Sequence, residues 1–355
     1  AEEYEGAWAP KAYSGRYGTN GWHLDFSDEN DLGADSSGNN NDWTVSNITV
    51  DDHTPDSPTN NFATMMLNAS MEEKQGNLYL ETSRTGYWDG TIATHGVNSG
   101  KWYYEVRVNV GSGDNFRSAV GWVVEPYQMT LPWNQRGTTG DPSGTMFNNY
   151  MKPVWATNYW KDGGNDGTAV AGSTGNVINV AVDLDAGKIW FGINGTYYDN
   201  SGSSGGDPGA GTGESMSGMH DAASRGRHYV PAVLLRSDGT IGSNNATFNF
   251  GQDSTFYAAL TAGTNSDTNG IGEFQYAVPT GFKALCSKNI AESSISQVGG
   301  EKMSEYFNTV LTSGDGSNAT VSGFGFQPDF IWHKSRTSSN NNQLMDSLRV
   351  DGSAG

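Results

Sequence analysis

The chain has 355 residues, of which 35% are hydrophobic, 12% are aromatic and 48 are glycine, and its formal net charge is −19. Because glycine costs about 1 kcal/mol relative to alanine in a helix interior, this composition excludes an all-helical or coiled-coil protein. Such negative charge repels a phosphate backbone, and the sequence has no basic stripe that could bind nucleic acid. The single cysteine, Cys286, excludes a disulfide framework and a cysteine-based zinc cluster.

No apolar run approaches the roughly 20 residues that span a bilayer. The N-terminal sequence AEEYEGAWAP also lacks the charged and apolar regions of a signal peptide. We therefore expect a soluble, acidic, β-rich protein without a membrane span. Charged residues make up only 17% of the chain, so Asn, Ser, Thr and Gly must supply much of its solubility. This balance is common in extracellular and virion proteins.

Residues 1–60 show little hydrophobic periodicity, and we expect an extended N-terminal segment with short strands at 21–26 and 42–45. Between these strands, residues 35–42 (DSSGNNND) are rich in oxygen ligands. Their spacing does not fit the EF-hand pattern, so a solvated turn is favoured over a calcium loop. Calcium is the minor alternative, and the sequence predicts no other cofactor and no metal ligand.

The strongest strand signal is at residues 101–110 (KWYYEVRVNV), which alternate with a period of two. This pattern predicts a half-buried antiparallel strand with Trp102 on the buried face. Glu105 falls on the opposite face, where a cross-strand ion pair is the simplest role for it. Residues 119–124 (AVGWVV) are almost entirely apolar and predict a partner strand buried on both faces.

Residues 176–198 predict two consecutive hairpins. The first turns at an Asp-Ala-Gly sequence and the second at Asn194-Gly195. The Asn-Gly pair favours a type I′ turn because both central residues need a positive φ. Residues 229–235 and 246–251 predict a final strand pair.

Three long stretches are predicted to be loops, which at this length are usually functional or mobile. They are residues 125–175, 199–227 and 261–276. Near the C-terminus the strand pattern restarts, with short strands predicted at 306–311, 319–322 and 329–334. Three strands in so short a piece are marginal as an independent domain. We expect this piece to pair with another subunit, unless the chain is a fragment of a longer protein.

Four sequence blocks resemble the SPRY domain, a lectin-like sandwich of two antiparallel sheets. In chain order they are 100–106 (GKWYYEV), 119–122 (AVGW), 182–195 (VDLDAGKIWFGING) and 248–252 (FNFGQ). The resemblance covers about two thirds of the chain and implies an all-β fold, an antiparallel two-sheet SPRY-like sandwich with flanking β segments. The expected domains are an N-terminal extended segment (1–60), the sandwich (61–285) and the start of a second small β-domain (291–355).

The flanking segments resemble those that bracket SPRY-like domains in tail and fibre proteins of marine bacteriophages. The resemblance rests on 21–28 (GWHLDFSD), 35–43 (DSSGNNNDW) and 279–289 (PTGFKALCSKN). The start of a β-domain that often follows there is similar to 307–311 (FNTVL), 323–336 (GFGFQPDFIWHKSR) and 346–349 (DSLR). The resemblance implies a non-enzymatic structural protein of the virion, a phage tail or fibre subunit that contacts other virion proteins. It also implies a homo-oligomer, which is a trimer if the chain belongs to a fibre.

Two carboxylates raise the alternative of a glycoside hydrolase, because Asp183 and Asp185 project from the same face of a predicted strand. Such an enzyme needs two carboxyl groups across a substrate cleft. Here the two residues flank a hairpin turn, where Asp caps backbone N–H groups, so a structural role is favoured. No serine or cysteine nucleophile motif is present. We therefore predict no catalytic residue and no enzymatic activity.

Aromatic residues and amides gather in the predicted 125–175 loops. An aromatic face beside amide groups suits the C–H faces and hydroxyl groups of a sugar. The candidate ligand-binding residues are Trp133, Asn134, Tyr150, Trp155, Tyr159 and Trp160. The chain's negative charge favours a neutral or weakly charged glycan of the host surface. The alternative is that these rings plug the end of the sandwich or a subunit interface.

The leading functional hypothesis is therefore a structural protein of the extracellular virion, with a sandwich that binds a glycan or receptor. Two alternatives belong to other classes. One is a secreted carbohydrate-active enzyme, and the other is a SPRY adaptor that binds peptides. The single cysteine argues against the zinc-binding modules that often accompany such adaptors.

Overall fold

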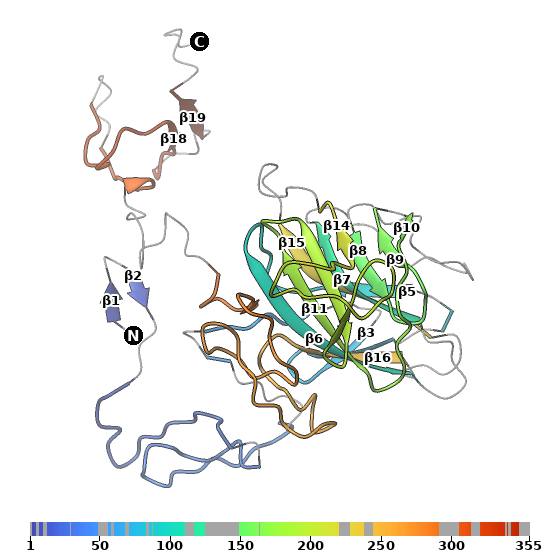
Figure 1. Ribbon diagram of the computed structural model, residues 1–355. Coiled ribbons are helices and arrows are strands. Elements are labelled where there is room, and N and C mark those ends of the chain that lie inside the picture. The colour runs from blue at the N-terminus through green and yellow to red at the C-terminus, as the bar shows by residue number, and fades with distance from the viewer. Residues whose placement is uncertain are drawn as a thin grey trace. The chain divides into compact units, whose positions relative to one another are not determined.

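The computed structural model describes the backbone of residues 2–4 and 7–9 and, with side chains, most of the chain between residues 13 and 347 (Figure 1). The latter segments are 13–28, 30–48, 56–57, 60–67, 71–82, 85–86, 88–110 (for Val110 the backbone alone), 117–124, 149–162, 164–219, 228–237, 244–290, 305–313, 320–337, 339 and 342–347. The chain divides into two compact units, residues 15–290 and residues 1–14 with 291–355. The described elements are all β-strands, and within the described residues no helix is long and apolar enough to cross a membrane.

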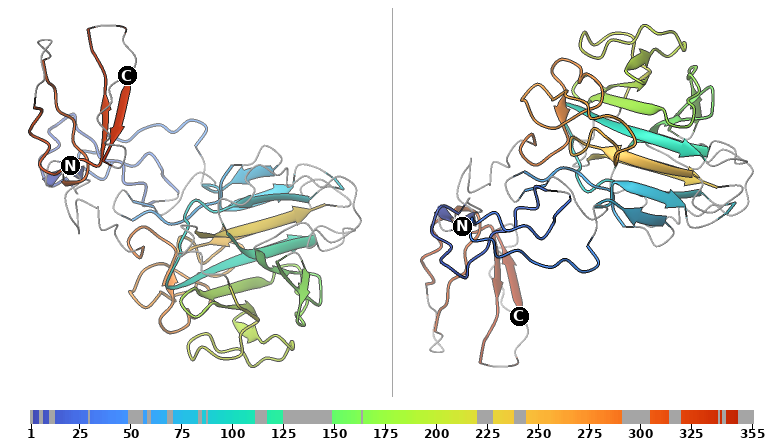
Figure 2. Two further views of the ribbon diagram at one scale, coloured as in Figure 1. Left: turned by 90° about the horizontal axis from the view of Figure 1, so that it is seen from above. Right: turned by 90° about the horizontal axis from the view of Figure 1, so that it is seen from below.

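The larger sheet has nine strands in the order β13-β12-β11-β6-β16-β4-β3, with β14 paired to β12 and β17 paired to β6. The strands are β3 (Met71–Lys74), β4 (Tyr79–Thr82), β6 (Lys101–Val110), β11 (Val177–Asp183), β12 (Lys188–Ile193), β13 (Thr196–Tyr198), β14 (Met216–Ser217), β16 (Asn244–Asn249) and β17 (Lys283–Ala284). The pairs are antiparallel except for β17, which runs parallel to β6. Figure 2 shows β4, β16 and β6 side by side, although they are far apart in the sequence.

The smaller sheet has six antiparallel strands in the order β10-β9-β8-β7-β15-β5. They are β5 (Trp88–Ile92), β7 (Arg117–Val124), β8 (Asn149–Pro153), β9 (Tyr159–Lys161), β10 (Gly164–Asp166) and β15 (Tyr229–Arg236). The predicted all-β fold with two antiparallel sheets is thus confirmed. The prediction of a loop over 125–175 is wrong in its described part, because β8, β9 and β10 lie there.

The main core lies between the two sheets and follows the alternation predicted for β6. Trp102, Tyr104 and Val106 of β6 are buried there with Val120 and Trp122 of β7. The Tyr104 and Trp122 rings lie 5.8 Å apart. Full burial of a large apolar side chain contributes about 1.5–3 kcal/mol, so these rings compensate for the scarcity of Leu and Ile.

The other face of β6 is not half-exposed as predicted, because the chain after β16 covers it. Tyr103 and Glu105 are both fully buried. Tyr103 lies in a second apolar cluster with Phe274 and Phe282, and its ring is 5.1 Å from that of Phe274. The large sheet is therefore buried on both faces around the centre of β6.

The predicted hairpins of 176–198 are confirmed as β11, β12 and β13. In the second turn Asn194 has φ 50° and Gly195 has φ 82°, as a type I′ turn requires. The final strand pair is wrong in its pairing, because β15 joins the smaller sheet and β16 joins the larger one. Both strands are as apolar as predicted, but apolarity does not specify a partner.

In the described part of the flanking segments, the strand predicted at 329–334 is confirmed as Phe330–His333, but other predicted strands are wrong. Residues 21–26 and 42–45 form none, nor do 306–311 or the described part of 319–322. The outer segments instead form two ribbons of two strands each. These are β1 (Glu2–Tyr4) with β2 (Ala7–Ala9), and β18 (Phe330–His333) with β19 (Gln343–Asp346).

The beginning and the end of the chain segment that forms the sandwich lie side by side. The Asn61 N–H donates to the Ser287 Oγ at 2.9 Å, and the Ser287 N–H donates back to the Asn61 carbonyl at 2.8 Å. Cys286 is fully buried beside them, and its burial raises the pKa of its thiol, in line with the predicted role of a small core residue.

Candidate functional site

The candidate glycan-binding residues do not form one exposed surface. Trp133 and Asn134 lie outside the described residues. Tyr150 and Tyr159 are fully buried inside the sandwich. The Tyr150 hydroxyl donates to the Gly218 carbonyl at 2.8 Å, and the Tyr159 ring stacks on Phe191 at 5.7 Å. These two rings are covered by protein, so their faces are not available to a sugar.

The remaining two candidates belong to a tryptophan cluster on the outer face of the smaller sheet. Trp155 lies 5.4 Å from Trp88 and 5.5 Å from Trp160, ring centroid to ring centroid. Trp88 and Trp160 are buried, whereas Trp155 is half-buried. Trp155 is therefore the one described candidate ring with an accessible part. Sequence reasoning missed Trp88, because only the pairing of β5 with β15 brings it into the same sheet as β9.

Two long connections, residues 154–176 and 199–219, are hydrogen-bonded to each other in their described parts at one end of the sandwich. The Thr168 N–H donates to the Asn200 carbonyl at 2.7 Å, and the Asn200 amide donates to the Ser215 carbonyl at 2.8 Å. The Lys161 ammonium donates to the Ser217 carbonyl at 2.7 Å. We call residues 154–176 with 199–219 the loop end. Its loops are tied to each other, so a surface built on them is ordered before any ligand arrives.

A lysine lies buried beneath the loop end. The Lys152 Nζ donates to the Val170 carbonyl at 2.5 Å and lies 5.9 Å from the centre of the Tyr159 ring. Burial lowers the pKa of this amine to about 7. The side chain is 1% exposed, so it fastens the loop end from inside and does not meet a ligand.

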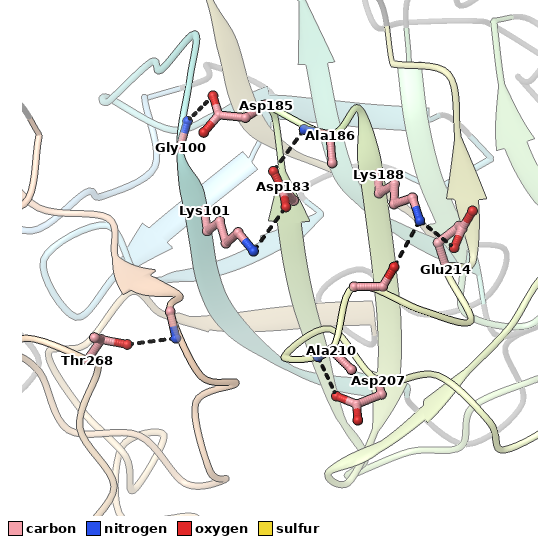
Figure 3. Close-up of polar contacts among 12 residues, drawn as sticks. Gly100, Lys101, Asp183, Asp185, Ala186, Lys188, Asp207, Ala210, Glu214 and Thr268 are labelled. Atoms are coloured by element: carbon pink, nitrogen blue, oxygen red, sulfur yellow. Dashed lines mark hydrogen bonds and ion pairs between the residues drawn. The ribbon is translucent and has the colours of Figure 1, made fainter.

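The two carboxylates considered for glycoside hydrolysis are used as caps (Figure 3). The Asp183 carboxylate accepts the Ala186 N–H at 2.9 Å and pairs with the Lys101 Nζ at 3.2 Å. The Asp185 carboxylate accepts the Gly100 N–H at 2.9 Å. Asp183 thus has the turn-capping role that the sequence favoured, whereas Asp185 caps Gly100, which lies 85 residues away in the sequence.

Alternating charges continue across the same end of the larger sheet (Figure 3). Asp183 lies opposite Lys101 on one side and Lys188 on the other. The Lys188 Nζ lies 3.3 Å from the Glu214 carboxylate and donates to the Gly211 carbonyl at 2.9 Å. These contacts fasten the 199–219 connection to β12, so the charges hold the loop end in place.

Glu105 is not the cross-strand ion-pair residue that the sequence predicted. Its carboxylate accepts the Gln275 N–H at 2.9 Å, the Tyr276 N–H at 2.8 Å and the Tyr103 hydroxyl at 2.8 Å. Burial raises its pKa, against the opposing effect of these hydrogen bonds. Its full burial makes it an anchor for the covering segment, and no substrate reaches it.

The Asp-rich turn at 35–42 also uses its oxygens internally. The Asp35 carboxylate accepts the N–H groups of His23 and Ser37 at 2.8 Å and of Asn41 at 2.9 Å. These backbone hydrogen bonds hold the pKa of Asp35 well below its usual value, against the opposing effect of burial. Among the described residues, no group of three or more His, Cys, Asp or Glu is placed to hold a metal ion.

Two family models match parts of the chain. Residues 101–204 match the SPRY domain, and residues 302–354 match a domain of unknown function (DUF7483). The crystal structure of the SPRY domain of human HERC1 is similar over 52% of this chain and 92% of its own, at 15% identity and a TM-score of 0.34. The TRIM65 PSpry domain is similar over 53% of this chain and 92% of its own, at 12% identity and a TM-score of 0.34. No curated protein is similar to the chain in sequence.

The part of the chain that matches the SPRY domain, residues 101–204, lies within the sandwich. SPRY domains mediate protein interactions, and the match therefore suggests an interaction module at residues 101–204. The matched residues include the capped hairpin at Asp183 and the tryptophan cluster members Trp155 and Trp160. The loop end therefore lies largely inside the interaction module.

Proposed function

We propose that this chain is a non-enzymatic structural subunit of a virion, of the phage tail or fibre type. Its SPRY domain would bind a glycan or receptor of the host surface, and its flanking segments would contact other virion proteins in the extracellular particle. Two features support this proposal: the interaction module at residues 101–204 and the resemblance of the flanking segments to phage proteins.

The observation that carries the proposal is the exposure of large apolar side chains outside the sandwich. Phe307 is 71% exposed, Trp332 is 67% exposed and Leu344 is 62% exposed. Trp332 and Leu344 are opposite each other in the β18–β19 ribbon. Contiguous apolar surface of this kind marks a protein interface. We infer that a homo-oligomer covers it, and that the oligomer is a trimer if the chain forms a fibre.

Light scattering on the purified chain tests the assembly. We expect a particle mass that is a multiple of 38.0 kDa. The double variant Trp332→Ser, Leu344→Ser should dissociate, because it removes apolar area from the proposed interface. The matched control is Leu67→Ser, which alters a residue that is 74% exposed in the other unit and should leave the mass unchanged. A compact monomer at high concentration would overturn the proposed oligomer.

Immunogold labelling tests membership of the virion. An antiserum raised against the purified chain should label the tails or fibres of particles produced by the source culture. Labelling that is confined to the host cells, with bare particles, would overturn the virion role.

Attachment to a glycan is proposed to use the surface around Trp155, together with Trp133 and Asn134. Each stacked ring contributes on the order of 1 kcal/mol, so a single site should be weak and act through multivalency. A glycan array with wild type and a Trp133→Ala, Trp155→Ala variant tests this, with Tyr257→Ala as an aromatic control in the same unit. Equal binding by all three proteins would place the site elsewhere.

The SPRY match favours one second candidate, a module that binds a peptide. Loops that are fastened before binding suit a short extended ligand as well as a sugar. Screening the chain against a peptide array separates the two. Binding to peptides with no binding on the glycan array would favour the peptide module.

A further inference from the structure

The N-terminal segment displays two tryptophans that the proposed function leaves without a role. Trp22 is 47% exposed and Trp43 is 53% exposed. Their ring centroids lie 4.9 Å apart with an interplanar angle of 66°, so the two rings form a corner. We call this pair the tryptophan corner. Of the leucines, isoleucines, valines and aromatic residues between 13 and 48, Leu32 is the one that the described structure buries.

The tryptophan corner is held by hydrogen bonds instead of by a core. The Trp43 N–H donates to the Gly33 carbonyl at 2.8 Å, and the Ser36 N–H donates to the His23 carbonyl at 2.7 Å. Gly33 is required there, because a Cβ at this position would lie 1.9 Å from the Trp43 carbonyl oxygen. Backbone hydrogen bonds at Gly33 and His23 therefore hold the segments that carry the two rings in place.

Two asparagines complete this lock. The Asn39 amide donates to the carbonyls of Gly18 at 2.7 Å and Gly21 at 2.9 Å. The Asn41 amide donates to those of Thr19 at 3.1 Å and Gly21 at 2.9 Å. Together with the bonds to Asp35 described above, these contacts engage most polar side chains of the turn within the segment, while both indoles stay exposed. The rings are thus ordered before binding, which lowers the entropy cost of association.

The negative charge of the residues around Trp22 and Trp43 favours a positively charged partner. Residues 13–48 contain six acidic residues and one arginine, a net charge of −5. Asp25, Asp28 and Asp31 are exposed beside the lock. The same segment of a second copy carries the same negative charge, so two such surfaces would repel each other. A cationic partner is attracted by the carboxylates, and a cation placed over an indole face adds a favourable cation–π interaction.

We propose that Trp22 and Trp43, with the carboxylates of Asp25, Asp28 and Asp31, dock a cationic segment of another protein. Its arginines or lysines lie on the indole faces while their charges meet the aspartates. Arginine suits the site better, because its guanidinium both stacks on rings and pairs with carboxylates in a bidentate manner. The docking surface is independent of the glycan site and of the β18–β19 interface.

A fluorescein-labelled deca-arginine peptide is the probe, and fluorescence anisotropy gives its Kd for the full chain at low and physiological salt. The variant Trp22→Ala, Trp43→Ala should bind the peptide about fivefold to tenfold more weakly. Its control is Tyr257→Ala, Tyr306→Ala, which removes two exposed rings outside residues 13–48 and outside the proposed oligomer interface, and should change the Kd by less than twofold. An unchanged thermal transition in each variant shows that the fold is retained.

The contribution of the aspartate charges to peptide binding can be tested with a matched control. Asp25, Asp28 and Asp31 each accept a backbone N–H through Oδ1, which an asparagine can still do, so Asp→Asn at all three removes only charge. Asp185, Asp199 and Asp207 are similar caps in the same unit and supply the control triple variant. We expect the first triple variant to bind at least fivefold more weakly than the control.

Equal loss in the two triple variants would overturn the proposal, because the peptide would then respond only to the overall charge. Equal Kd values for wild type and the Trp22→Ala, Trp43→Ala variant would also overturn it. A change in oligomer mass in that tryptophan variant, with unchanged peptide binding, would assign the corner to a second copy instead.

Discussion

Strand β6 of the sandwich and strand β18 of the β18–β19 ribbon both carry aromatic residues two positions apart on one face, but only β6 buries them. In β6, Trp102 and Tyr104 are at most 5% exposed, whereas in β18 Phe330 and Trp332 are 56% and 67% exposed. β6 is hydrogen-bonded to β11 and β16 and faces a second sheet, while in the described ribbon β18 pairs with β19 alone. Alternation therefore specifies which face of a strand is apolar, and only a second layer buries that face.

The largest loss of stability is expected from the truncation of an aromatic ring in the core. Trp122→Ala should lower the free energy of unfolding by about 3–5 kcal/mol, because it leaves a cavity between the sheets. Urea denaturation of the full chain measures the loss. If this variant does not fold, Trp122→Phe should still lower the midpoint. A loss below about 1 kcal/mol would contradict the assignment of this ring to the core.

The buried lysine beneath the loop end gives a test based on pH. Burial lowers the folded-state pKa of Lys152 from 10.5 to about 7, so between these values the unfolded chain binds more protons. The stabilising contribution of the neutral amine is therefore present above about pH 10.5 and is lost as the pH falls through 7. From pH 7 to 9, the free energy of unfolding of wild type should rise relative to Lys152→Met by up to about 1.4 kcal/mol per pH unit.

Urea denaturation of both proteins at matched pH values measures this difference. The variant serves as the control for every other titrating group, since those groups are common to the two proteins. Parallel pH profiles would show that Lys152 is solvated in solution and does not lie beneath the loop end.

A turn glycine gives a smaller effect. Gly195→Ala places a Cβ at φ 82° and 2.8 Å from Cδ1 of Tyr276, so it should destabilise the sandwich by about 1–3 kcal/mol. Gly211→Ala, with φ 72° and no atom within 4 Å, is the control for the backbone effect alone. Thermal unfolding should show a larger loss for Gly195→Ala, and equal losses would argue against packing between this turn and Tyr276.

The smallest effect is expected at the ribbon. Trp332→Ala should change the free energy of unfolding of the dissociated chain by less than about 0.5 kcal/mol, because the ring is mostly solvated there. In the proposed oligomer the same substitution should lower stability with a dependence on protein concentration. Measurement at low and high concentration separates the two states. A large loss at low concentration would mean that the ribbon is packed within one chain.

The sequence predicted those parts of the site whose structure is local. Asp183 caps the backbone N–H of Ala186 in its own hairpin, as its position just before an Asp-Ala-Gly turn indicated. Burial of Tyr150 and Tyr159 could not be predicted, because it depends on strands that form within a stretch expected to be a loop. The role of Glu105 was missed for a similar reason, since its partners come from residues 275 and 276.

By itself, the sequence determined the all-β class, the buried face of β6, the turn at Asn194-Gly195 and the SPRY resemblance. These depend on side-chain period and turn chemistry, which act within a few residues. The tertiary structure alone decided that β15 and β16 lie in different sheets and that the second face of β6 is covered. It also decided that Trp22 and Trp43 stand exposed on a hydrogen-bonded turn. Burial depends on contacts between residues far apart in the chain, and apolarity draws a side chain toward a core without specifying which partner covers it.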